Sequence, residues 1–152
     1  MHARLNFRDA SPGAMKMLVD MREYLRDCGL SERLRLLVEI RISQINGCAY
    51  CVDLHVHQVR SAGETAQRLD CLCVWRDVTL FDARERAALA WAEALARVAD
   101  TRAPDDVFAE VSAQFGDREI VDLSLAICAM NAWNRFGVGF RMQPPTRNEQ
   151  DV

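Results

Sequence analysis

The chain has 152 residues, of which 50% are hydrophobic and 27% charged, and its formal net charge is −3. This balance is typical of one globular domain with a sizeable core, and it excludes the basic surface of a nucleic-acid-binding protein. No apolar run approaches the ~20 residues of a membrane span, and the charged N-terminal residues are unlike a secretory signal. Six cysteines without such a signal favour the reducing cytoplasm, where we expect this protein.

The first half of the chain shows apolar residues at helical spacing. Residues 1–10 lack periodicity and are expected to form an arm. Ser11 and Pro12 are typical of a helix start, with serine as the cap, and the stripe that follows ends at Gly29. A second helix is expected to begin after Ser31, to be apolar on most sides, and to end at Asn46-Gly47.

The second half continues the pattern with five more expected helices. They cover about 48–61, 64–73, a long alanine-rich segment capped by Asp82, 105–115, and an apolar segment capped by Asp117. Trp75 and Phe81 fall in a looser connection, as lid or core aromatics. Residues 141–152 are expected to form a flexible tail. The prediction is an all-α bundle of six to seven helices in one domain, 1–152, with a core at about 10–140.

The chemistry of the sequence is concentrated between Asn46 and His55. If a helix begins near Cys48, then Cys51 and His55 lie one turn apart on one face, and Cys48 lies in the first turn. The apolar side of this helix is expected to consist of Val52, Leu54, Val56 and Val59. His57 points roughly opposite His55 and is expected at the surface.

This spacing favours thiol chemistry. A thiol is nucleophilic only as a thiolate, and the positive end of a helix favours the thiolate, most strongly at Cys48. An imidazole one turn from Cys51 can accept its proton. A sulfenic acid on one cysteine can condense with the other thiol, and an external reductant then resets the disulfide.

Two simpler interpretations of Cys48 and Cys51 stand beside this one. They could be zinc ligands, with His55 as a third, or ordinary packed cysteines. The sequence has no second CxxC, and Cys71 and Cys73 have a spacer that suits chelation poorly. Redox use is favoured, with no metal or other cofactor. Cys28 and Cys128 are expected in the core.

The run Arg41-Ile42-Ser43-Gln44-Ile45-Asn46-Gly47-Cys48-Ala49-Tyr50-Cys51-Val52-Asp53-Leu54-His55 resembles the alkylhydroperoxidase D-like branch of the carboxymuconolactone decarboxylase superfamily. Two further stretches are similar to the same pattern. One joins Gly63-Glu64, Gln67-Arg68-Leu69 and Trp75-Arg76, and the other is Asn131-Ala132-Trp133-Asn134-Arg135. The resemblance covers roughly residues 10 to 140.

The resemblance implies an all-helical domain that forms a homo-oligomer, often a trimer or a hexamer, and that reduces peroxides through its dithiol. By position, Cys51 would become the sulfenic acid, Cys48 would be its proton donor and resolving partner, and His55 would belong to a proton relay. The helix dipole alone would favour Cys48 as the more acidic thiol. The histidine spacing and the family both favour Cys51, which we follow.

The sequence departs from the family at Leu36, where the relay usually has a glutamate. Glu39, three residues on, shares a helix face with that position and could reach His55. Alternatively, Glu39 could pair with a nearby arginine on a solvated face, which would leave the relay incomplete.

Three functions follow, in order of preference. The first is a thiol-dependent peroxide reductase that needs a peroxide substrate and an external thiol reductant. The second is a redox-sensing or structural oligomeric module with little turnover. The third is a lactone-acid decarboxylase, which has no use for a dithiol. Asn131, Trp133 and Asn134 either brace the core or line the pocket beside the dithiol, because buried polar groups need partners.

Overall fold

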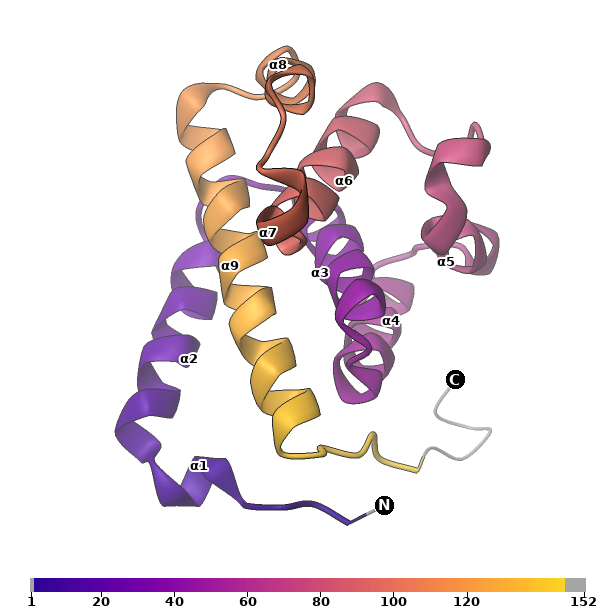
Figure 1. The fold of residues 1–152 in the computed structure, drawn as a ribbon. Coiled ribbons are helices and arrows are strands. Elements are labelled where there is room, and N and C mark those ends of the chain that lie inside the picture. Colours follow the sequence, from indigo (N-terminus) through magenta and orange to yellow (C-terminus); the bar gives the residue numbers. More distant parts are fainter. Residues whose placement is uncertain (1, 147–152) are drawn as a thin grey trace.

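Helices make up every regular element between residues 2 and 146, the part of the chain that the computed structural model describes (Figure 1). In chain order they are α1 (Phe7–Ala10), α2 (Pro12–Arg26), α3 (Glu32–Asn46), α4 (Ala49–Ser61), α5 (Ala66–Cys71), the 3₁₀ helix η1 (Leu72–Asp77), α6 (Ala83–Ala96), α7 (Val98–Thr101), α8 (Asp105–Ser112) and α9 (Asp117–Gly139). The all-α prediction is confirmed for these residues. No helix among them is long and apolar enough to cross a membrane.

The described chain has more helices than the expected six to seven because α1, α7 and η1 are too short to show a periodicity. Residues 1–10 were expected to form an arm without periodicity, and this prediction is wrong for α1, which is helical. Phe7 is buried, and its ring centroid lies 5.2 Å from that of Phe136 and 5.3 Å from that of Phe140. One aromatic side chain therefore fixes the N-terminal segment to the end of α9.

Most predicted helix starts are found, but the predicted cap at Asp117 is wrong, and Ser11 occupies the N-cap position of α2 without a side-chain cap bond. The side chains of Ser31 and Asp82 accept backbone N–H groups at the starts of α3 and α6. The Ser11 side chain makes no such bond at α2, where proline occupies the first turn. At α9 the cap residue is Gly116, and Asp117 is already the first helical residue.

The centre of the molecule is α3, which packs on α4, α6 and α9. Leu37, Val38, Ile40 and Ile42 on this helix are fully buried, so it is apolar on most sides, as expected. In Figure 1, α9 runs along α2 and lies between α2 and α3, so it packs against both helices. This arrangement brings the end of α9 to the start of α4, where the dithiol lies.

Three side chains outside this centre bear on the predictions. Trp75 and Phe81 are buried in the core cluster around η1, so they are core aromatics and form no lid. Cys28 is buried, as expected, whereas Cys128 is exposed. Cys128 lies on the side of α9 that faces away from the core, and a uniformly apolar helix gives no pattern from which that side could be predicted.

The segment after α9 departs from the expected tail at its beginning. The N–H of Met142 donates to the carbonyl of Gly137 at 2.9 Å, and the Met142 side chain is half-buried. This hydrogen bond turns the chain back over the end of α9. Residues 147–152 of the predicted tail lie outside the described residues.

Candidate active site

A sharp turn between α3 and α4 positions the two cysteines. Gly47 ends α3 with a φ of +68°, a backbone conformation that side chains disfavour. The N–H of Cys48 donates to the carbonyl of Ser43 at 3.0 Å. Cys48 is the N-cap of α4, one residue before the expected first turn, and its sulfur accepts the N–H of Cys51 at 3.4 Å. The thiol of Cys48 thus takes the place that a serine or threonine hydroxyl usually fills.

The sulfurs of Cys48 and Cys51 lie within disulfide-bonding distance, and their Cα atoms are 5.4 Å apart. Both side chains are buried, at 1% and 5% exposure. Gly137 of α9 lies directly against them, because a Cβ at this position would be 2.6 Å from the Cys48 sulfur. Gly137 lies inside α9, which continues to Gly139. A glycine inside an apolar helical run was the available signal of a close approach.

His55 follows on the buried face of α4, one turn after Cys51. That face consists of Cys51, His55 and Val59, whereas Val52, Leu54 and Val56 are only partly buried. The predicted apolar side of this helix was therefore mostly wrong. His57 is exposed, as expected.

The environment of His55 favours the neutral imidazole. Its Nδ1 lies 3.0 Å from Oε1 of Gln58 and 3.3 Å from Oε2 of Glu39, and two acceptors there favour a proton on Nδ1. Burial lowers the pKa of His55 below its usual range, and the negative charge of Glu39 opposes that shift only in part. Neutral His55 with Nδ1 protonated has a free Nε2 that can act as a base.

Glu39 lies between His55 and Arg35, and it is 5% exposed rather than on a solvated face. Arg35 donates to its Oε1 at 2.8 Å. Its Oε2 lies near His55 but accepts no hydrogen bond within residues 2–146. The structure therefore places Glu39 next to both His55 and an arginine, the two partners that the sequence analysis considered. Leu36 occupies the position where the family relay usually has a glutamate, and it is buried in the apolar core.

A cavity opens beside Cys51. Its lining includes Cys51, His55 and Glu39 together with Tyr50 and Trp133, whereas Cys48 does not line it. Its remaining lining residues are Arg8, Val19, Arg22, Leu25, Leu54, Ala129, Met130 and Met142. Of the two sulfurs, it is that of Cys51 which a small molecule in this cavity can approach.

Of the polar residues near the end of α9, some brace the core and one lines the cavity. Asn134 is 1% exposed and donates to the hydroxyl of Ser43 at 3.0 Å, and Asn46 donates to its Oδ1 at 2.9 Å. It therefore ties α9 to the end of α3. Asn46 also donates to Asn131. Trp133 instead lines the cavity, and its buried indole N–H has no partner within the described chain.

The other cysteines lie away from this site. Cys71 is half-buried and Cys73 is exposed. Within residues 2–146, no three or more His, Cys, Asp or Glu side chains are grouped so that they could hold a metal ion.

Comparison with known proteins identifies the family. The model of the carboxymuconolactone decarboxylase family matches residues 12–94. The chain belongs to the carboxymuconolactone decarboxylase family. The chain is also similar to an uncharacterised protein, YdfG of Bacillus subtilis. The two are 35% identical over 138 residues, which cover 91% of this chain and 94% of YdfG.

Solved structures agree with this family assignment. A protein of unknown function from Agrobacterium tumefaciens, described as a candidate AhpD antioxidant defence protein, is 42% identical with a TM-score of 0.94. The match covers 96% of this chain and all of that one. It supports the alkylhydroperoxidase D-like branch of the carboxymuconolactone decarboxylase family. The debrominase Bmp8 has a TM-score of 0.82 at 16% identity, over 91% of this chain and 74% of Bmp8, which shows a shared fold alone.

Proposed function

We propose that this protein is a thiol-dependent peroxide reductase. The observation that carries the proposal is the placement of Cys51, whose sulfur is within bonding distance of a second sulfur and lines a cavity together with His55. A family member in the alkylhydroperoxidase D-like branch with this arrangement has the parts that peroxide reduction needs. The proposed reaction starts from two reduced thiols, which suits a cytoplasmic protein.

In the proposed reaction, His55 accepts the proton of the Cys51 thiol through its free nitrogen. The thiolate attacks the terminal oxygen of the hydroperoxide, the O–O bond breaks, and the alkoxide leaves as an alcohol after taking a proton from His55. Cys51 is then a sulfenic acid. Glu39 stabilises the transient imidazolium, and Gln58 holds the ring in the required tautomer.

The second step closes the disulfide. The sulfur of Cys48 attacks that of Cys51, the S–S bond forms as the S–O bond breaks, and the hydroxide takes the proton of the Cys48 thiol and leaves as water. Gly137 leaves room for the Cys48 sulfur at this point. An external dithiol then reduces the disulfide and is itself oxidised. The sum is one hydroperoxide and two thiols converted to one alcohol, one water and one disulfide.

The proposal is tested by peroxide consumption in the presence of a dithiol reductant. We expect Cys51→Ser to abolish turnover and Cys48→Ser to retain one round of oxidation without turnover. Cys73→Ser is the matched control, because Cys73 is exposed and away from the site. Equal rates in wild type and Cys51→Ser would refute the assignment.

One observation favours a redox-sensing module as the second candidate. Leu36 stands where the family relay usually has a glutamate, and Glu39, the nearest carboxylate, is already ion-paired with Arg35. If the relay is incomplete for this reason, the dithiol oxidises reversibly with negligible turnover. Disulfide formation that changes assembly or partner binding, without steady-state peroxide consumption, would distinguish this module from the reductase. Assembly into a homo-oligomer, trimeric or hexameric, is part of either proposal.

A further inference from the structure

The cavity beside Cys51 carries two arginines at its mouth, Arg8 of α1 and Arg22 of α2. Both side chains are exposed, and neither is paired with a carboxylate of the described chain. Arg35, by contrast, is buried and paired with Glu39. The charge of Arg22 is close enough to His55 to act on it. The mouth of the cavity is therefore positively charged without an internal counter-ion.

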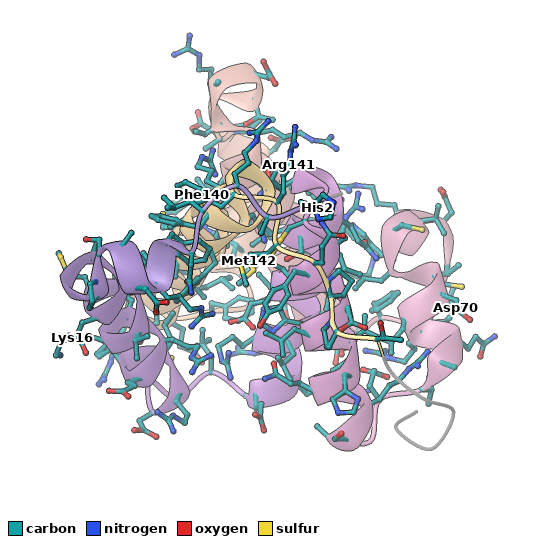
Figure 2. The ribbon with its side chains drawn as sticks, turned by 90° about the horizontal axis from the view of Figure 1, so that it is seen from below. His2, Lys16, Asp70, Phe140, Arg141 and Met142 are labelled. Carbon is teal, nitrogen blue, oxygen red and sulfur yellow. A yellow bond between two sulfur atoms is a disulfide. The ribbon has the colours of Figure 1, made fainter. Side chains whose placement is uncertain are left out.

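The interior of the same cavity is mostly apolar. Val19, Leu25, Leu54, Met130 and Met142 line it. Figure 2, seen from below, shows Met142 between the N-terminal helices and the helices that carry the dithiol. Such a lining suits a hydrocarbon or aromatic body.

Trp133 connects the apolar interior to the charged mouth. The guanidinium of Arg8 lies over its indole ring, 5.6 Å from the centroid. The indole N–H is buried and unpartnered, a state that costs free energy unless a bound molecule supplies an acceptor. The cavity thus offers apolar walls and two arginines without a carboxylate partner, which together suit an amphipathic anion.

We propose that this cavity selects organic hydroperoxides that carry a carboxylate at the end remote from the peroxide. The inference rests on the proposed peroxide reductase function and names its substrate class. Arg8 and Arg22 bind the carboxylate, the apolar walls bind the body, and the hydroperoxide end reaches Cys51. A carboxylate is matched by guanidinium groups, and an ester of the same skeleton is not.

The test compares one substrate skeleton in two charge states. The substrates are 4-(2-hydroperoxypropan-2-yl)benzoic acid and its methyl ester, and the readout is kcat/KM with a dithiol reductant. We expect wild type to prefer the acid by about tenfold, a ratio in keeping with partly exposed charge pairs. Arg22→Gln and Arg8→Gln should each reduce that preference, and Arg22→Lys should retain part of it because it keeps the charge. Arg60→Gln is the control, since Arg60 is exposed and outside the cavity.

Binding is measured separately from turnover. The non-reactive pair 4-isopropylbenzoate and its methyl ester is titrated by calorimetry into the Cys51→Ser protein. Tighter binding of the acid, lost in Arg22→Gln, supports the carboxylate site even if no peroxide is reduced, in which case only the peroxidase proposal fails. Equal kcat/KM for acid and ester, or equal binding of the non-reactive pair, would overturn the inference. So would an acid preference that Arg60→Gln reduces as much as Arg22→Gln.

Discussion

Gly137 is the residue whose side chain, a single hydrogen, leaves space for the dithiol. In Gly137→Ala the new methyl group would lie 2.6 Å from the Cys48 sulfur, so α4 or α9 must shift. Overpacking of this kind costs about 1–3 kcal/mol. We expect Gly137→Ala to have a free energy of unfolding in urea lower by that amount than Gly139→Ala, and to slow disulfide closure after one equivalent of peroxide.

Gly139→Ala is the matched control, since it lies on the same helix and a Cβ there meets nothing within 4 Å. Both variants replace glycine by alanine, so the gain in helix propensity is similar and largely cancels in the comparison. If the two variants are equally stable and form the disulfide at the same rate, the close approach has no role.

His55 should make stability depend on pH in a defined window. Burial lowers its pKa in the folded protein below the ordinary 6.5, so the unfolded chain takes up the proton first as the pH falls. Folded stability is therefore full above pH 6.5 and decreases as the pH falls through 6.5 toward the folded pKa. We expect wild type to lose more unfolding free energy than His55→Gln between pH 7.5 and pH 5.5.

His57→Gln serves as the control for this experiment. His57 is two residues away and exposed, so its replacement should leave the wild-type pH dependence intact. Urea unfolding curves at the two pH values supply the measurement. An identical pH dependence in wild type and His55→Gln would show that His55 has the same pKa in the folded and unfolded chains.

At the scale of the elements, one side chain joins α9 to α3. Asn134 is buried and bonded to Ser43 and Asn46. In Asn134→Ala, Asn46 loses one of its two hydrogen-bond acceptors, and the end of α3 loses its side-chain link to α9. We expect the free energy of unfolding to fall by about 1–3 kcal/mol. Urea unfolding of this variant is compared with Val121→Ala, a truncation at an exposed position of the same helix. Equal losses in the two variants would contradict a bracing role.

The long helices could be predicted because their signals are local. The caps at Ser31 and Asp82, the turn at Gly47 and the apolar periodicity all depend on residues within one or two turns. The one-turn helices α1 and α7 have no such signal. Their positions depend on contacts made far along the chain, such as that of Phe7 with the end of α9.

The orientation of α4 could not be predicted for a different reason. Hydrophobicity alone favoured burying Val52, Leu54 and Val56, but the buried face carries His55. Burying an imidazole is tolerated only where a polar partner meets it. Here Gln58 is hydrogen-bonded to the ring, and the carboxylate of a glutamate on another helix lies 3.3 Å away. The dithiol motif and the reach of Glu39 to His55 could be predicted from the sequence, whereas the burial of His55 could not.

The cavity belongs to the scale of the whole molecule. Its lining comes from α1, α2, α3, α4, α9 and the segment after α9, so no local pattern could assemble it. The motif led to Cys51 and His55, which the structure places together. Arg8, Arg22 and Met142 lie in segments that the sequence marked as an arm, an ordinary helix and a tail.

The N-terminal segment and the end of α9 meet beside this cavity, and the aromatic contacts of Phe7 help to hold them there. The N–H of Arg4 donates to the carbonyl of Phe140 at 3.0 Å, and Phe7 packs against Phe136 and Phe140. In Figure 1 the N-terminal segment passes below the end of α9. Because α1 is a single turn, the contacts of Phe7 supply most of what keeps it docked.

Phe7→Ala should therefore release α1 locally while leaving the bundle folded. Truncating a buried phenylalanine costs about 3–5 kcal/mol, which is more than a one-turn helix can recover through its own hydrogen bonds. We expect faster amide exchange at residues 4–10 and 137–142, with the core of α3 unchanged.

Since Arg8 would leave the mouth of the cavity, the preference for the carboxylated hydroperoxide over its ester should also fall. Leu5→Ala is the control, because Leu5 is exposed. If Phe7→Ala exchanges as slowly as Leu5→Ala, the aromatic contact does not hold the segment in place, and Arg8 must be positioned by other means.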